Sequence, residues 1–71
     1  MPKVSGVNHR RAVNAFRKCG FNVVREGRKH IIMSNGIDDI VIPRNNPVNA
    51  YTMGAIVKDS GLSVEEFKGK L

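Results

Sequence analysis

A short basic segment that ends in a histidine is the part of this 71-residue sequence best suited to chemistry. It reads Arg25-Glu26-Gly27-Arg28-Lys29-His30, which places three cations within five residues of His30. An imidazole exchanges protons near neutral pH, and cations around it attract a phosphodiester and the negative charge that develops as the ester is cleaved. The segment therefore predicts a ribonuclease-type site. The alternative is a solvated β-turn whose charges only keep the protein soluble.

The roles in such a reaction can be assigned from its chemistry. Cleavage of RNA without a metal needs a base for the 2′-hydroxyl proton, an acid for the leaving 5′-oxygen, and positive charge over the phosphorane oxygens. His30 can serve as the base or the acid, but not as both at once. The other role is left to Lys29, Arg25 or water. Loss of one general acid–base group lowers a rate by about 10²–10⁴-fold, so we expect a modest enzyme.

The other candidate ligands and nucleophiles suggest structural roles. The second histidine, His9, stands beside Arg10 and Arg11, and we interpret it as an exposed, non-catalytic residue of a helix. The single Cys19 cannot form an internal disulfide, which favours a reducing cytoplasm, and we interpret it as a small core residue. Cys and His show no zinc-ligand spacing, so we expect no metal and no other cofactor.

Composition limits the class of protein. The length predicts one domain, 1–71, which buries only about 60% of its unfolded surface. Lys and Arg number 12 against 6 Asp and Glu, a net charge of +6 that favours a polyanionic or acidic partner. One Tyr, three Phe and no Trp leave little surface for stacking unpaired bases. The sequence has no signal-peptide pattern and no apolar run of about 18 residues, so we expect a cytoplasmic protein without a membrane partner.

The element before the basic segment is predicted to be an amphipathic helix. Ser5 is the first candidate for its N-cap and Asn8 the second, and Gly20 ends it. Apolar side chains recur at helical spacing at Ala12, Val13, Phe16 and Cys19, with basic or polar residues opposite. The helix should thus bury one face and present a basic one.

Three strands are predicted next, at 21–26, 30–33 and 38–42. Asn35-Gly36 predicts a hairpin with a type I′ turn, because both residues tolerate a positive φ, and Pro43 ends the third strand. Apolar side chains in 31–33 fall on both faces of the second strand. One face should meet the helices and the other a partner.

The last third of the sequence is predicted to be helical. Thr52 is the expected N-cap of a helix that ends at Gly61, with Met53, Ile56, Val57 and Ser60 on its inner face. Ser63 and Glu66 have the capping-box spacing, and the short helix that follows should carry Phe67 into the core. The predicted fold is α+β, ordered α-β-β-β-α with a helical tail, and its three-stranded antiparallel sheet has the helices packed on one face.

The order and spacing of several segments resemble the HicA (YcfA-like) toxins of bacterial type II toxin–antitoxin systems. The segments that carry the resemblance are 20–21, 25–33, 41–44, 46–52 and 61–63. The resemblance implies a double-stranded-RNA-binding-domain-like fold, metal-independent cleavage of mRNA, and neutralisation by a HicB antitoxin. It implies that His30 is the catalytic histidine. Together with the basic segment, it makes Arg25, Arg28, Lys29 and Arg44 the candidate RNA-binding residues.

The sequence departs from the family pattern at two places. It has Arg28-Lys29-His30 where many members have Gly-Ser-His, and Asn45 where members of this subgroup often have a histidine. Pairing of the second and third strands is expected to bring Asn45 near His30. The competing prediction is a non-catalytic double-stranded-RNA-binding module of the same fold, in which the cations follow phosphates. A DNA-binding domain is less favoured, since no recognition-helix pattern is present.

Overall fold

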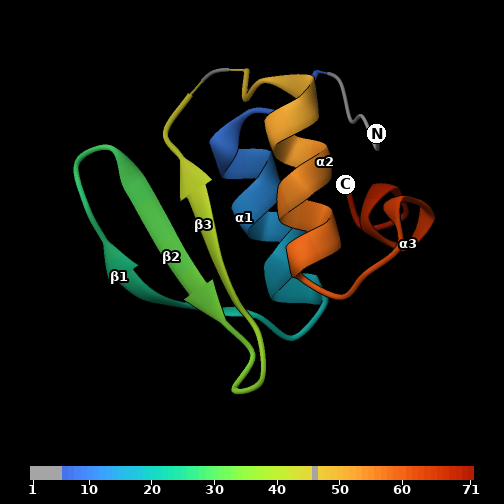
Figure 1. Cartoon of the computed structure of the whole chain (residues 1–71), viewed down its shortest axis with the longest axis horizontal. Coiled ribbons are helices and arrows are strands. Elements are labelled where there is room, and N and C mark those ends of the chain that lie inside the picture. The colour runs from blue at the N-terminus through green and yellow to red at the C-terminus, as the bar shows by residue number, and fades with distance from the viewer. Residues whose placement is uncertain (1–5, 46) are drawn as a thin grey trace.

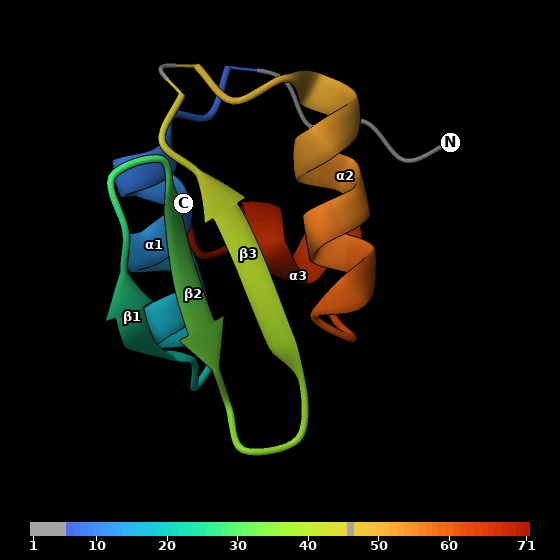
Figure 2. The same ribbon diagram turned by 60° about the vertical axis from the view of Figure 1, so that its left-hand side comes forward.

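A computed structural model describes residues 6–45 and 47–71 of the chain. The elements are α1 (His9–Lys18), β1 (Asn22–Glu26), β2 (His30–Ser34), β3 (Asp39–Pro43), α2 (Ala50–Asp59) and α3 (Val64–Lys68). The strands form an antiparallel sheet in the order β1-β2-β3 (Figure 1). The helices lie on one side of the sheet, and α3 contacts both α1 and α2 (Figure 2). The predicted α+β fold, with its α-β-β-β-α order and three-stranded antiparallel sheet, is confirmed.

Helix α1 has the amphipathic character that its sequence predicts. Its buried residues are Ala12, Val13, Ala15 and Phe16, and its arginines are exposed. The side chain of Asn8 caps the helix by accepting a hydrogen bond from the Arg11 N–H at 2.8 Å. Ser5, the other predicted cap, lies outside the described residues. Cys19 is half-buried and packs against the core, in agreement with its interpretation as a small apolar residue.

The predicted type I′ turn between β2 and β3 is wrong. Within the described chain every residue with a positive φ is a glycine, and here only Gly36 has one, at 90°. Four residues, 35–38, form the loop. The side-chain oxygen of Asn35 accepts hydrogen bonds from the N–H groups of Ile37, at 2.9 Å, and Asp38, at 2.6 Å. These Asx-type hydrogen bonds stabilise the four-residue loop, and in this loop Asn35 does not adopt the left-handed conformation that a type I′ turn requires.

The predicted N-cap of the second helix is also wrong. Helix α2 begins at Ala50, and its cap is Asn49 instead of Thr52. The Asn49 side-chain oxygen accepts from the Thr52 N–H at 3.2 Å, and Asn is among the strongest N-cap residues. The predicted inner face is confirmed, because Met53, Ile56, Val57 and Ser60 are all buried.

The end of the chain follows its prediction closely. Gly61 has a φ of 79° and follows α2, as expected of a left-handed cap. The Ser63 side chain accepts from the Glu66 N–H at 3.1 Å, and the Glu66 carboxylate accepts from the Ser63 N–H at 3.2 Å. This capping box starts α3, which carries the buried Phe67 into the core.

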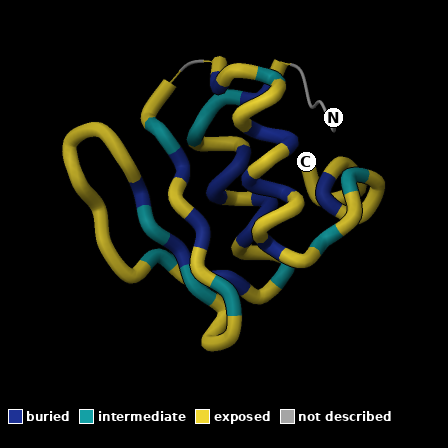
Figure 3. The backbone as a smooth tube through the Cα atoms, in the orientation of Figure 1, coloured by how far each residue is buried: buried dark blue, intermediate teal, exposed yellow. Residues whose placement is uncertain are grey.

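The core lies between the sheet and the helices, where the buried positions gather in Figure 3. Its centre is the ring of Phe16, which lies 5.6 Å from that of Phe21 and 4.7 Å from that of Phe67. The opposite face of the sheet is open: Val24 is 62% exposed and Val41 is 48% exposed. Among the described residues, no helix has the length and apolarity needed to span a membrane.

Candidate functional site

The predicted site lies at the turn between β1 and β2. The last strand pair joins Glu26 to Ile31, and the Gly27 N–H then donates to the His30 carbonyl at 2.8 Å. A Cβ atom at residue 27 would lie 3.2 Å from that carbonyl oxygen, which is tighter than ordinary contact. Glycine thus lets the backbone close tightly just before His30, so that Arg28 and Lys29 form the tip of the turn.

Arg44 holds this turn from the end of β3. Its backbone N–H donates to the Lys29 carbonyl at 2.8 Å, and its side-chain Nε donates to the Gly27 carbonyl at 2.8 Å. These two bonds tie the turn to the neighbouring strand on both sides of Arg28. Arg44, predicted to bind RNA, is therefore first a residue that positions the turn.

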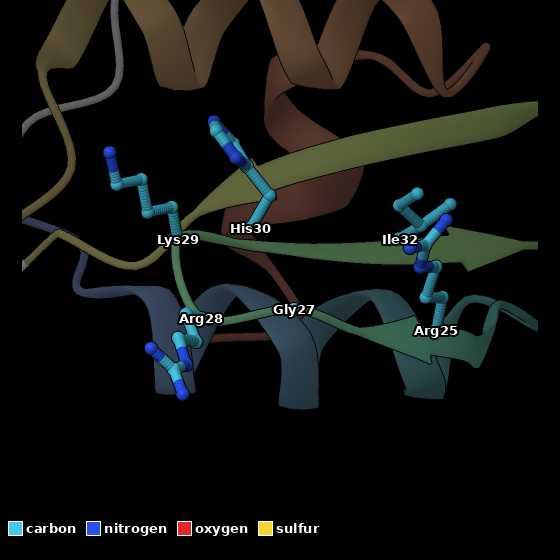
Figure 4. Close-up of a pocket in the computed structure, with 6 residues that line it drawn as sticks. All are labelled: Arg25, Gly27, Arg28, Lys29, His30 and Ile32. Carbon is cyan, nitrogen blue, oxygen red and sulfur yellow. The ribbon is translucent and has the colours of Figure 1, made fainter.

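A surface hollow of about 370 Å³ lies beside the turn, and we call it the turn hollow. Its lining consists of Arg25, Gly27, Arg28, Lys29, His30 and Ile32 (Figure 4). Four of the five predicted site residues, Arg25, Arg28, Lys29 and His30, are thus brought together, while Arg44 is not part of the lining. The lining contains no carboxylate, so the field of the hollow is positive.

The strand register explains why these side chains share the turn hollow. Side chains alternate along a strand, so His30 and Ile32 lie on the same face of β2, opposite to the buried Ile31. Arg25 pairs with Ile32 across the β1–β2 ladder, after an irregularity between Val23 and Arg25. The hollow therefore opens on the outer face of the sheet. In Figure 4 the side chains of Lys29 and His30 extend to one side of the hairpin, and that of Arg28 extends to the other.

The His30 imidazole is open to a ligand. It is exposed, and it makes no hydrogen bond or ion pair with any residue that the structure describes. No neighbouring group fixes which ring nitrogen carries the proton, so the ring can act as an acid or a base toward a molecule in the turn hollow. Asn45, expected near His30, does not line this hollow.

The interpretation of His9 as an exposed residue is wrong. His9 is half-buried, and its Nδ1 lies 3.3 Å from the Asn45 carbonyl oxygen, which also accepts from the His9 backbone N–H at 3.2 Å. A carbonyl oxygen only accepts, so Nδ1 carries a proton and Nε2 is left for another partner. This histidine, unlike His30, has an oriented ring.

His9 belongs to a second surface hollow, which we call the helix hollow. Its polar lining consists of His9, Arg10, Asn14, Arg17, Glu26 and Arg44, and its apolar lining consists of Val13 and Ile31. Arg10 and Arg17 are not among the site residues predicted from the sequence. Their spacing with Val13 and Asn14 places them on one face of a helix, so the sequence alone could have grouped them. The sequence could not have shown that Arg44 lies near them.

Comparisons with known proteins do not identify a family for this chain. No protein-family model, curated protein or solved structure matches this chain. Within residues 6–45 and 47–71, no three His, Cys, Asp or Glu side chains gather as a metal site would require.

Proposed function

We propose that this chain is a HicA-like toxin of a type II toxin–antitoxin system, a cytoplasmic endoribonuclease that cleaves mRNA without a metal. The observation that carries the proposal is the turn hollow, whose lining contains the exposed imidazole of His30 and the cations Arg25, Arg28 and Lys29 but no carboxylate. A site of this charge attracts a phosphodiester, and an imidazole beside it transfers a proton. The resemblance of the sequence to the HicA toxins supports the same conclusion.

The proposed reaction divides its tasks among the lining residues. His30 takes the proton of the 2′-hydroxyl or gives one to the leaving 5′-oxygen. The guanidinium of Arg25 can donate two parallel hydrogen bonds to the phosphate oxygens, whereas Lys29 acts as a compact charge. Together they offset the negative charge that gathers on the phosphorane. Attack of the 2′-oxygen on phosphorus breaks the bond to the 5′-oxygen, so the products are a 2′,3′-cyclic phosphate and a 5′-hydroxyl.

The chemistry of the products tests this proposal. A single-stranded oligoribonucleotide incubated with the protein and a chelator should yield fragments that end in a 2′,3′-cyclic phosphate, as measured by mass spectrometry. The same oligonucleotide with 2′-O-methyl riboses should remain intact, because it lacks the attacking hydroxyl. Cleavage of the methylated strand, or fragments with a 5′-phosphate, would contradict the proposed mechanism.

The second candidate is a non-catalytic module that binds double-stranded RNA. One observation favours it: the His30 ring has no hydrogen-bond partner within the described chain, whereas a histidine that transfers protons is commonly oriented by one. In such a module the cations would follow phosphates and His30 would only donate a hydrogen bond. Tight binding of an RNA duplex without any product would favour this candidate over the enzyme.

The proposed protein partner is a HicB-like antitoxin that covers the turn hollow. Because Arg25, Arg28 and Lys29 all line this hollow, we expect the partner to present carboxylates to them. The double variant Arg28→Glu, Lys29→Glu should weaken the complex at least tenfold by calorimetry, since two attractive charges become repulsive. Lys58→Glu, an exposed change on α2, is the control and should leave the affinity nearly unchanged. Equal losses of affinity in the double variant and in the control would mean that the partner binds another surface.

A further inference from the structure

The helix hollow and the turn hollow lie on opposite sides of the same hairpin. Glu26 and Ile31 form a strand pair, and Ile31 is buried on the face that meets the helices. Both residues line the helix hollow, between the hairpin and α1, whereas His30 and Ile32 line the turn hollow on the outer face. Along the hairpin, residues that line one hollow therefore stand directly beside residues that line the other. An extended polyanion that crosses the end of the turn can therefore contact both.

We infer that the helix hollow binds a phosphate group of the RNA strand whose scissile phosphate lies over His30. The inference rests on the proposed function and adds a second binding site to it. Three arginines, Arg10, Arg17 and Arg44, face one carboxylate, that of Glu26, in this hollow. A cluster with this excess of guanidinium groups suits an anion with several acceptor oxygens. Phosphate contacts of this kind position a strand without reading its bases.

Two of the lining groups are held in place before any ligand arrives. The Nε of Arg44 is bonded to the Gly27 carbonyl, which fixes the guanidinium and leaves its terminal nitrogens for a ligand. The Nδ1 of His9 is bonded to the Asn45 carbonyl, which fixes the ring and leaves Nε2. Both bonds reach backbone atoms of the loops that surround the hollow. Groups oriented in this way lose less conformational freedom on binding than free surface side chains.

The exposed basic residues of α1 offer a matched comparison. Arg11 is exposed on α1, like Arg17, but it does not line the helix hollow. If the cations of α1 only formed a solvated surface, Arg11 and Arg17 would be equivalent. If the helix hollow binds a phosphate, Arg17 should contribute more to RNA binding than Arg11 does.

The probe for this inference is a short 2′-O-methyl oligoribonucleotide, which the proposed chemistry cannot cleave. Its binding should be measured by fluorescence anisotropy over a series of KCl concentrations. Arg17→Gln should weaken binding several-fold at low salt and reduce the slope of log K against log [salt] by about 0.7, the value for one phosphate of a single strand. Arg11→Gln should change neither quantity by a comparable amount. Equal effects of the two substitutions, or no effect of either, would overturn the inference.

Removal of the Glu26 carboxylate tests the helix hollow with a substitution that should strengthen binding and not weaken it. Glu26→Gln should strengthen binding of the probe, because it removes a repulsive charge from the helix hollow. A damaged fold cannot produce tighter binding, so this variant keeps the test valid even if Arg17→Gln lowers the melting temperature. Unchanged or weaker binding by a folded Glu26→Gln protein would count against the site.

The two histidines allow the two hollows to be observed separately. The chain contains only His9 and His30, so their ring signals in an NMR spectrum can be assigned by substituting one of them. In a His30→Ala protein, addition of the methylated strand should still shift the ring signals of His9. A His9 ring that does not respond would overturn the inference.

Failure of this inference can be told apart from failure of the proposed enzyme. His30-dependent cleavage of ordinary RNA with equal effects of Arg11→Gln and Arg17→Gln would remove the second site and keep the enzyme. The expected differences in binding without any cleavage of ordinary RNA would keep the phosphate site and remove the enzyme.

Discussion

Replacement of His30 by alanine should lower the rate of RNA cleavage by about 10²–10⁴-fold, the usual effect of losing a general acid or base. The ring is exposed and has no hydrogen-bond partner among the described residues, so its removal should leave the melting temperature nearly unchanged. Cleavage is best followed with a fluorophore-labelled single-stranded RNA under single-turnover conditions, which report on chemistry and not on product release.

The control for this variant has to exclude a contaminating nuclease. Lys68→Ala changes an exposed residue of α3, outside both hollows, and should cleave as fast as the unmodified protein when purified in the same way. A folded His30→Ala protein that cleaves as fast as this control would refute the catalytic role of His30. A cell in which the gene is induced should show the same contrast, with growth arrested by the control and not by His30→Ala.

Truncation of Phe16 to alanine should destabilise the domain by about 3–5 kcal/mol, the usual range for a buried phenylalanine. The Phe16 side chain is fully buried and contacts the rings of both Phe21 and Phe67. It therefore links α1, the start of the sheet and α3. A natural domain has about 0.05–0.15 kcal/mol of stability per residue, so this single loss removes much of the total for so short a chain.

Urea denaturation monitored by circular dichroism measures the effect. Ile37→Ala is the matched control, because Ile37 lies in the β2–β3 loop and is 89% exposed, and its cost should stay within about 0.5 kcal/mol. A loss of less than about 1 kcal/mol for Phe16→Ala would mean that the three rings do not form the centre of the core. Any cleavage that survives the substitution should fall with the fraction of folded protein.

The sequence by itself determined the features that depend on neighbours along the chain. The helical spacing in α1 has a period set by the backbone, and the capping box of Ser63 and Glu66 spans three residues, so both could be predicted and both are confirmed. The cluster of Arg25, Arg28, Lys29 and His30 could also be predicted, because these residues are close together along the chain. Residues within one tight hairpin end must lie near one another, whatever the rest of the fold does.

Two of the wrong predictions, the N-cap of α2 and the turn between β2 and β3, concern places where the sequence is compatible with two local arrangements. Asn49 and Thr52 can both cap a helix, and the choice depends on where the preceding loop turns back toward the core. Asn35-Gly36 is compatible with a two-residue turn, but the four-residue loop gives the Asn35 side chain two backbone donors. For the hairpin, the residues of the loop were predicted and its length was not. For α2, the helix was predicted and its first residue was not.

Only the tertiary structure decided the contacts that join distant parts of the chain. Arg44 reaches the Gly27 carbonyl from 17 positions away, and His9 reaches the Asn45 carbonyl from 36 positions away. Neither contact follows from periodicity or from a motif, because both arise when α1 packs beside the end of the hairpin and β3 pairs with β2. The packing of the apolar faces fixes the distance between these segments, and the polar groups at their margins are then brought together into the helix hollow.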